Sequence, residues 1–227
     1  MEDVKILGVI PARGGSKGIK DKNITLLAGK PLLFYTIETA KKTKRIDRLI
    51  LSTDSPKIRK LVANYNIEID SRPKSLAKDC SKLSDALIYI LKKLKKREGY
   101  RPYGVIILQP TSPFRKKQDI EKGIDKFLKK GYDCLFSVCE AEHHPYWMHR
   151  LVNGEPVPLF NITEKQRQSL AKIYRENGVI CIVKTDYLLA EKKIFGGKMG
   201  VILMDRFESV DIDTELDLKI AEFLLQK

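Results

Sequence analysis

The residues best suited to chemistry lie in two short segments near opposite ends of the 227-residue chain. The first, residues 11–18, is Pro11-Ala12-Arg13-Gly14-Gly15-Ser16-Lys17-Gly18, and Lys22-Asn23 follows it; we call residues 11–18 the glycine loop. Glycines allow backbone N–H groups to approach an anion, because no Cβ stands in the way. Arginine and lysine add positive charge and strong donors. This composition predicts a phosphate site, and a triphosphate is its natural ligand.

The second segment, residues 209–215, is Ser209-Val210-Asp211-Ile212-Asp213-Thr214-Glu215; we call it the aspartate segment. Asp211 and Asp213 are two residues apart, so in extended backbone both carboxylates point to the same side. Hard oxygen ligands in this arrangement suit Mg²⁺ that is shared with triphosphate oxygens. The alternative is structural, since Asp213 or Thr214 could cap the helix that follows.

Other familiar sites are absent or unsuited to chemistry. Neither the P-loop string G-x-x-x-x-G-K-[ST] nor the dinucleotide fingerprint G-x-G-x-x-G occurs. His143 and His144 are adjacent, and neighbouring side chains on a strand point to opposite faces, so we do not expect them to chelate one metal ion. The four cysteines form no C-x-x-C pair and are expected to be reduced thiols.

The elements that must position these segments alternate along the chain. Apolar runs predict strands over 4–10, 48–52, 67–69, 105–108, 132–139 and 179–183. Helical periodicity predicts helices over 31–42, 56–65, 83–96, 117–128 and 214–225. This alternation predicts an α/β fold with a doubly wound, mostly parallel sheet. In such a sheet ligands bind beyond the carboxyl ends of the strands, which is where the glycine loop follows the first strand.

The alternation breaks at about residues 143–168, a stretch with several prolines and a plausible hairpin turn at Asn153-Gly154. We interpret this stretch as an arm that leaves the sheet. Residues 1–227 are otherwise expected to form a single domain, because one domain commonly reaches this length.

The net charge is +14, from 43 Lys and Arg residues against 29 Asp and Glu residues. This balance favours an anionic partner but is also typical of a lysine-rich solvated surface. A basic nucleic-acid-binding module is the alternative from another class, although no helix-turn-helix, zinc-finger or RRM signature occurs. No run of about 18 apolar residues predicts a membrane helix. The first residues do not form a signal peptide, so a cytoplasmic location is expected.

Three strings, taken together, resemble the acylneuraminate cytidylyltransferases, or CMP-sialic acid synthetases. They are V-I-P-A-R-G-G-S-K-G-I-K-D-K-N-I, L-Q-P-T-S-P and D-I-D-T-E-x-D, and the matching segments run in family order from Val9 to Asp217. The resemblance implies a Rossmann-like, Mg²⁺-dependent enzyme that joins CTP and a nine-carbon α-keto sugar acid into a CMP-sugar and pyrophosphate. It also implies a homodimer built through the arm. Legionaminate, pseudaminate and Kdo enzymes remain alternatives within this class.

The resemblance also implies roles for individual residues. Arg13, Lys22, Asp211 and Asp213 are expected to be catalytic, with Asp211 and Asp213 as the metal ligands. Nucleotide binding is expected at Ala12, Arg13, Gly14, Gly15, Ser16, Lys22, Asn23, Arg72, Ser81 and Ser84. Sugar binding is expected at Gln109, Thr111, Ser112, Arg167 and Arg175, and Phe195 is a plausible wall of the sugar pocket.

Overall fold

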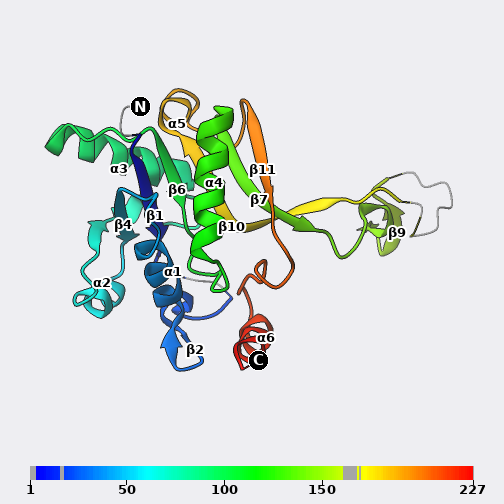
Figure 1. Cartoon of the computed structure of the whole chain (residues 1–227). Coiled ribbons are helices and arrows are strands. Elements are labelled where there is room, and N and C mark those ends of the chain that lie inside the picture. The colour runs from blue at the N-terminus through cyan, green and yellow to red at the C-terminus, as the bar shows by residue number, and fades with distance from the viewer. Residues whose placement is uncertain (1–3, 16–17, 161–167, 169, 227) are drawn as a thin grey trace.

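The computed structural model describes residues 4–15, 18–160, 168 and 170–226. Within these residues the central sheet has seven strands in the order β11-β7-β10-β6-β1-β4-β5 (Figure 1). The strands are β1 (Ile6–Pro11), β4 (Arg48–Thr53), β5 (Glu68–Ser71), β6 (Gly104–Ile107), β7 (Cys134–Glu140), β10 (Tyr174–Lys184) and β11 (Met199–Leu203). Only β10 runs antiparallel to its neighbours in this sheet. The sheet is therefore mostly parallel, as predicted.

Helices cover both faces of this sheet. They are α1 (Leu32–Lys41), α2 (Pro56–Val62), α3 (Leu83–Glu98), α4 (Lys117–Lys130) and α5 (Thr185–Glu191), whereas α6 (Glu215–Leu225) packs in a separate hydrophobic cluster. Side chains of β1 point alternately to the two faces of the sheet and so pack into two different core layers. Ile6 and Ile10 pack with α1, α2 and α4, whereas Leu7 and Val9 pack with α3 and α5. This division is the doubly wound arrangement expected from the alternation.

A smaller hydrophobic cluster joins the two ends of the chain. It contains Ile19 from just beyond the glycine loop, Leu27 from the short hairpin β2 (Leu26–Leu27) and β3 (Lys30–Pro31), and Ile212 from the aspartate segment. Leu218 of α6 completes it on the carboxyl-terminal side. Burying these side chains together places the aspartate segment against the glycine loop.

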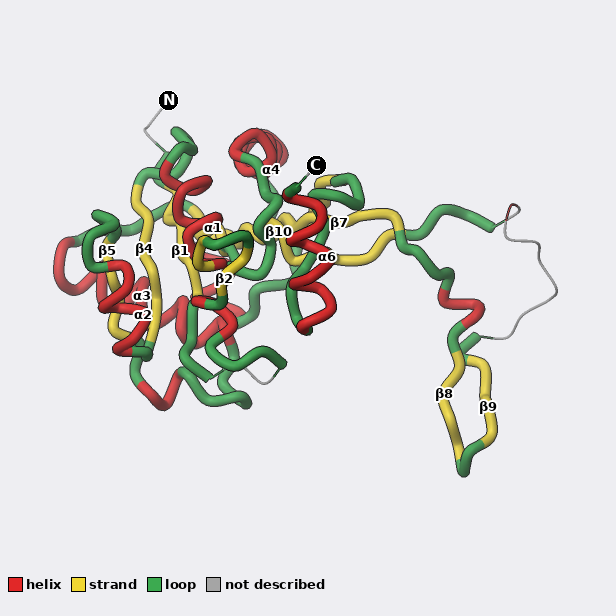
Figure 2. The backbone as a smooth tube through the Cα atoms, turned by 90° about the horizontal axis from the view of Figure 1, so that it is seen from below, coloured by secondary structure: helices red, strands yellow, loops and turns green. Residues whose placement is uncertain are grey.

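The arm leaves the sheet between β7 and β10 and extends away from the body of the molecule (Figures 1 and 2). It carries the antiparallel hairpin β8 (His149–Val152) and β9 (Glu155–Pro158). The predicted turn residues Asn153 and Gly154 both have positive φ, 53° and 87°, as a tight hairpin of this kind requires. No helix in the described part of the chain is long and apolar enough to cross a membrane.

Candidate active site

A cavity of about 680 Å³ lies beyond the carboxyl ends of β1 and β6, where a ligand site was expected. The predicted nucleotide residues that line it are Arg13, Lys22, Asn23, Arg72 and Ser81. Gln109, Thr111 and Asp213 also line it. The cavity therefore collects residues from segments that are up to about 200 positions apart in the sequence.

The glycine loop and the aspartate segment meet directly in this cavity. Lys22 Nζ lies 2.6 Å from Asp213 Oδ1. Gly18 packs against the backbone of Asp213 so closely that an added Cβ would lie 2.3 Å from the Asp213 carbonyl oxygen. Glycine at position 18 is thus required by this close approach, and one ligand can contact both segments.

Hydrogen bonds fix the glycine loop to the end of β4. The Ala12 N–H donates to the Ser52 carbonyl at 3.0 Å, and the Gly14 N–H donates to Asp54 Oδ1 at 3.0 Å. The Asn23 amide donates to the Arg13 carbonyl at 2.9 Å. In this state the N–H groups of Ala12 and Gly14 are engaged within the protein. Gly15 lies next to the part of the loop, including Ser16, that is outside the described residues.

Two of the cations that line the cavity, Arg13 and Lys22, are paired with carboxylates. Arg13 Nη1 lies 2.6 Å from Asp79 Oδ1, in addition to the Lys22–Asp213 pair. Lys78 and Lys82 line the same cavity, and sequence reasoning assigned a role to neither of them nor to Asp79. The lining thus carries an excess of positive charge, which suits a triphosphate.

Neither Asp211 nor Asp213 is the N-cap of α6. Thr214 is the N-cap of α6, and it forms a capping box with Asp217. The Ile212 N–H donates to the Thr111 carbonyl at 2.9 Å, which ties the segment to the turn after β6. Burial, and then the nearby Asp213 carboxylate, raise the pKa of Asp211, while a hydrogen bond from Thr111 opposes this shift. A cation bound beside Asp211 would relieve the unfavourable burial and repulsion.

This donor set fits Mg²⁺. The described residues contain no group of three or more His, Cys, Asp or Glu side chains that could hold a metal ion. Mg²⁺ bound together with a nucleotide commonly takes only one or two carboxylates, and substrate phosphates and waters supply the remaining oxygens. Asp211 and Asp213 would supply such a pair, and Lys22 already places a positive charge beside the Asp213 carboxylate.

Arg115 supports the turn after β6 from within the protein. It is only 3% exposed, and its Nε donates to the Val179 carbonyl at 2.6 Å. The other arms of its guanidinium donate to Thr36 Oγ1 at 3.1 Å and to the Gln109 carbonyl at 2.8 Å. Burial lowers the pKa of Arg115, and the Asp211 carboxylate opposes this shift. Arg115 therefore links α1, β10 and the Gln109 turn, a role that sequence reasoning did not assign.

A bulge in β10 brings backbone close to Gln109. The register with β7 shifts between Glu176 and Cys181, and Gly178 adopts a positive φ of 71°. A Cβ at Gly178 would lie 3.8 Å from the Gln109 side-chain nitrogen. The buried Asn177 amide donates to Ser209 Oγ at 2.7 Å. The bulge is thereby joined to the aspartate segment.

Several predicted residues do not line this cavity. Among the predicted nucleotide residues these are Ala12, Gly14 and Gly15. The predicted metal ligand Asp211 does not line it either, although its carboxyl is hydrogen-bonded to Thr111, which does.

Ser84, in the first turn of α3, and Ser112, at 1% exposure, are buried, so the cavity is bounded by Ser81 and Thr111 instead. Arg175 is exposed on β10. Together with Arg206, which has the larger effect, it lowers the pKa of Glu142 at the base of the arm. The predicted sugar contact Arg167 lies outside the described residues.

Phe195, which was predicted as a wall of the sugar pocket, does not line this cavity. It precedes β11, which runs parallel to β7 and therefore to β6 and β1, so Phe195 lies at the amino ends of the strands. Its ring packs edge-on against Phe136, with the centroids 5.5 Å apart. The cavity is at the opposite, carboxyl ends.

The cytidylyltransferase family model matches residues 7–219. The chain is 34% identical to the post-translational flagellin modification protein B of Campylobacter coli, over 98% of this chain and 96% of that protein. It is 34% identical to the CMP-N,N'-diacetyllegionaminic acid synthase of Campylobacter jejuni, over 97% and 95% of the two chains. It is 32% identical to the N-acylneuraminate cytidylyltransferase of Escherichia coli, and there it spans 98% of its own length but 52% of the relative.

Two solved structures have the same fold. One is a CMP:2-keto-3-deoxy-manno-octonic acid synthetase complexed with CTP, with a TM-score of 0.75, 16% identity and 98% coverage of both chains. The other is the 4-diphosphocytidyl-2C-methyl-D-erythritol synthase of Anaerococcus prevotii, with a TM-score of 0.68, 16% identity and 100% coverage of both chains. These likenesses show the Rossmann-like nucleotidyltransferase architecture. With a family model that matches nearly the whole chain and with relatives above 30% identity, this chain belongs to the cytidylyltransferase family.

Proposed function

We propose that this protein transfers a cytidylyl group from CTP to a nine-carbon α-keto sugar acid and releases pyrophosphate. The observation that carries the proposal is the meeting of Lys22 and Asp213 in one cavity, because it brings the segment that follows the glycine loop into contact with the aspartate segment. The names of the relatives, which describe sialic and legionaminic acid activation, support the same reaction class.

In this reaction the anomeric hydroxyl of the sugar attacks the α-phosphorus of CTP and loses its proton to solvent. The bond from the α-phosphorus to the bridging oxygen breaks, and pyrophosphate leaves. A step of this kind needs positioning and charge stabilisation more than covalent help. Arg13 and Lys22 would hold the triphosphate. Each must first leave its carboxylate partner, Asp79 or Asp213, which lies 2.6 Å away. Arg72 would add a third cation from the β5 side of the cavity.

We further propose that Asp211 and Asp213 hold Mg²⁺ together with the triphosphate. When bound there, the ion would neutralise charge on the phosphates and on the leaving pyrophosphate. Lys22 would then turn from Asp213 toward the phosphate oxygens. The support is the Asp211 carboxylate, whose pKa is raised by burial and by its neighbour Asp213.

The sugar acid would bind near Gln109 and Thr111, where the turn after β6 meets the bulge at Gly178. Two acceptors are candidates, because relatives named for N-acylneuraminate and for N,N'-diacetyllegionaminate are 32% and 34% identical to this chain. Pseudaminate and Kdo belong in the same comparison.

We also propose a homodimer built through the arm. The arm exposes large apolar side chains, among them Trp147, Leu151 and Phe160, and Leu151 is 74% exposed. Exposed apolar clusters of this kind mark interaction surfaces. Light scattering should give twice the monomer mass for the wild type, and Leu151→Asp should lower it. A wild-type monomer at micromolar concentration would contradict the dimer. The cytoplasmic location stays a prediction.

The test of function is pyrophosphate release across a panel. CTP, GTP and UTP are each combined with N-acetylneuraminate, N,N'-diacetyllegionaminate, pseudaminate and Kdo, with Mg²⁺ or with EDTA. We expect release with CTP and a nine-carbon acid when Mg²⁺ is present. The proposal fails if no pair releases pyrophosphate. It also fails if random duplex DNA binds the protein more tightly than CTP does, which would favour a nucleic-acid-binding module.

A further inference from the structure

A buried chain of polar contacts lies behind Arg72 and leads away from the cavity. Ser52 on β4 and Asp70 on β5 are paired across the two parallel strands. Both are deeply buried, at 0% and 4% exposure. Ser52 Oγ donates to Asp70 Oδ2 at 3.2 Å and accepts from Arg72 Nε at 3.1 Å. Arg72 thus reaches Asp70 through a single hydroxyl.

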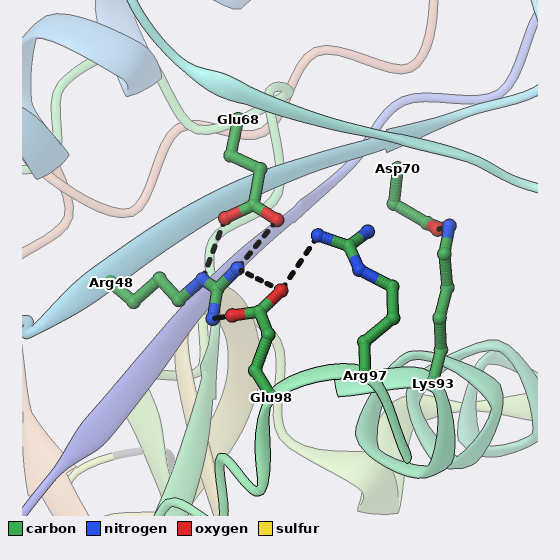
Figure 3. Close-up of polar contacts among 6 residues, drawn as sticks. All are labelled: Arg48, Glu68, Asp70, Lys93, Arg97 and Glu98. Carbon is green, nitrogen blue, oxygen red and sulfur yellow. Dashed lines mark hydrogen bonds and ion pairs between the residues drawn. The ribbon is translucent and has the colours of Figure 1, made fainter. Parts of the chain in front are cut away.

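Helix α3 supplies the other end of this chain. Lys93 Nζ donates to Asp70 Oδ1 at 2.8 Å, and Figure 3 shows the lysine reaching from the helix to the strand residue. Both oxygens of Asp70 are therefore bound, one by Lys93 and one by Ser52. We call Lys93, Asp70 and Ser52 the relay.

The relay sets the direction of the Ser52 hydroxyl. A serine hydroxyl has one O–H and two lone pairs. Because Asp70 takes the O–H, a lone pair of Ser52 faces the Arg72 Nε. Arg72 Nη2 adds a second contact, to the Ser52 carbonyl at 3.1 Å. Two bonds to one residue fix the plane of the guanidinium of Arg72, which lines the cavity.

Charge alternates along this path, from the Lys93 cation to the Asp70 anion and then to the Arg72 cation. Burial lowers the pKa of Arg72, whereas the carboxylates of Asp54 and Asp70 act in the opposite direction. In a buried setting such contacts are strong when fully made and costly when broken. Loss of the Lys93 contact can therefore alter the position of Arg72, although the two residues are joined only through Asp70 and Ser52 in this chain of contacts.

A neighbouring network anchors the same helix without leading to the cavity. Arg48 binds Glu68 through Nε and Nη2, and it binds Glu98, at the end of α3, through Nη1 at 2.6 Å (Figure 3). Arg97 Nη2 also reaches Glu98, at 2.6 Å. This network ends on Arg48, at the amino end of β4. It therefore holds α3 to the sheet in a comparable way but does not contact Arg72.

We propose that Lys93, Asp70 and Ser52 are positioning residues that fix Arg72 for nucleotide binding from behind the sheet. The inference rests on the proposed function in one respect, because it takes CTP as the ligand that Arg72 contacts. It deepens that function by naming residues outside the cavity that set nucleotide affinity.

The test measures CTP affinity by calorimetry in the presence of Mg²⁺. Lys93→Met should weaken CTP binding about threefold to tenfold, the size expected for losing one hydrogen-bonded constraint. Lys93→Arg keeps the charge and should restore most of the affinity. Glu98→Gln is the matched control: it removes a comparable ion pair on the same helix and should leave CTP affinity unchanged. At saturating CTP, kcat and the KM for the sugar acid should also stay unchanged in Lys93→Met.

Coupling through Ser52 separates a relay from simple loss of stability. Ser52→Ala removes the hydroxyl that joins Asp70 to Arg72 Nε by hydrogen bonds, so it should itself weaken CTP binding. Adding Lys93→Met to Ser52→Ala should then change the affinity no further. The relay is overturned if Lys93→Met binds CTP like the wild type. It is also overturned if Glu98→Gln loses as much affinity, or if the two losses simply add.

Lys93→Met leaves the buried Asp70 carboxylate without its cation, and the variant could fail to fold. The double variant Lys93→Met/Asp70→Leu removes both charges, a change that buried ion pairs often tolerate. It should fold and show the same loss of CTP affinity, and wild-type affinity in it would overturn the relay. A wild-type protein that does not bind CTP would overturn the proposed function as well, whereas normal wild-type binding with an unaffected relay variant overturns the relay alone.

Discussion

Gly18→Ala tests whether the glycine loop and the aspartate segment act on one ligand. The added Cβ would lie 2.3 Å from the carbonyl oxygen of Asp213 and 3.5 Å from its carbonyl carbon. An ordinary contact needs more than 3 Å, so the two segments must separate by roughly 1 Å. No rotamer change can relieve the overlap, because the obstructing atom belongs to the backbone.

A shift of this size moves Arg13 and Lys22 away from the carboxylate pair. A misplacement of about 1 Å in an active site can lower the rate about a hundredfold. We therefore expect kcat/KM for pyrophosphate release to fall about a hundredfold, which corresponds to about 2.7 kcal/mol of transition-state stabilisation. Gly18 is exposed and lies outside the two hydrophobic clusters of the sheet, so the protein should remain folded.

The assay is steady-state pyrophosphate release with saturating Mg²⁺, accompanied by thermal melting. Gly123→Ala in α4 is the control, because its Cβ would meet nothing closer than an Ile180 methyl at 3.4 Å, far from the cavity. It should keep full activity. If Gly18→Ala turns over within threefold of the wild type, the two segments do not share a ligand and the reasoning fails.

Four further experiments test other parts of the site. Arg115→Lys cannot reproduce three guanidinium contacts, so buried backbone carbonyls lose their donor and denaturant melts should show a loss of about 2–4 kcal/mol. Asp79→Asn removes the exposed partner of Arg13, so the Kd for CTP should fall by up to about fivefold, the equivalent of an exposed ion pair. A metal ligand must be ionised, and burial raises the pKa of Asp211. As the pH is lowered, the Mg²⁺ concentration needed for half-saturation should therefore begin to rise at a higher pH than it would for an aspartate with an ordinary pKa. Asp211→Ala should abolish Mg²⁺-dependent release while the fold stays intact.

Each of these expectations has a contrary outcome. Arg97→Gln, on the exposed face of α3, should change stability by less than about 0.5 kcal/mol. If Arg115→Lys changes the stability by no more than Arg97→Gln does, Arg115 does not support the turn after β6. Weaker CTP binding in Asp79→Asn would mean that Asp79 assists the nucleotide. A Mg²⁺ requirement that stays constant down to about pH 4, near the ordinary pKa of aspartate, would contradict the effect of burial on Asp211.

Most of the sheet could be predicted because its strands are buried on both faces. In β1, Ile6 and Leu7 pack into different core layers, and this produces the continuous apolar run that the sequence shows. β11 escaped prediction because it is an edge strand whose Met199, Val201 and Leu203 are exposed. The helix α5, with seven residues, is too short for its periodicity to stand out.

The site was predicted where local sequence carries the chemistry and missed where distant segments meet. The glycine loop and the aspartate segment each have a distinctive composition. The contacts of Arg13 with Asp79 and of Gly14 with Asp54 join residues 66 and 40 positions apart, and no local pattern signals them. That Phe195 lies away from the cavity could not be predicted either, because the sequence does not reveal that β11 runs parallel to β7, with Phe195 before its amino end.

The central claim is that Mg²⁺ and CTP bind together between the glycine loop and the aspartate segment. Calorimetric titration of CTP into the wild type and into Asp211→Ala, each with Mg²⁺ or with EDTA, tests it most directly. We predict that Mg²⁺ tightens CTP binding at least tenfold in the wild type and has no effect on affinity in Asp211→Ala. Equal CTP affinity with Mg²⁺ and with EDTA in the wild type, or an undiminished Mg²⁺ effect in the variant, would contradict the claim.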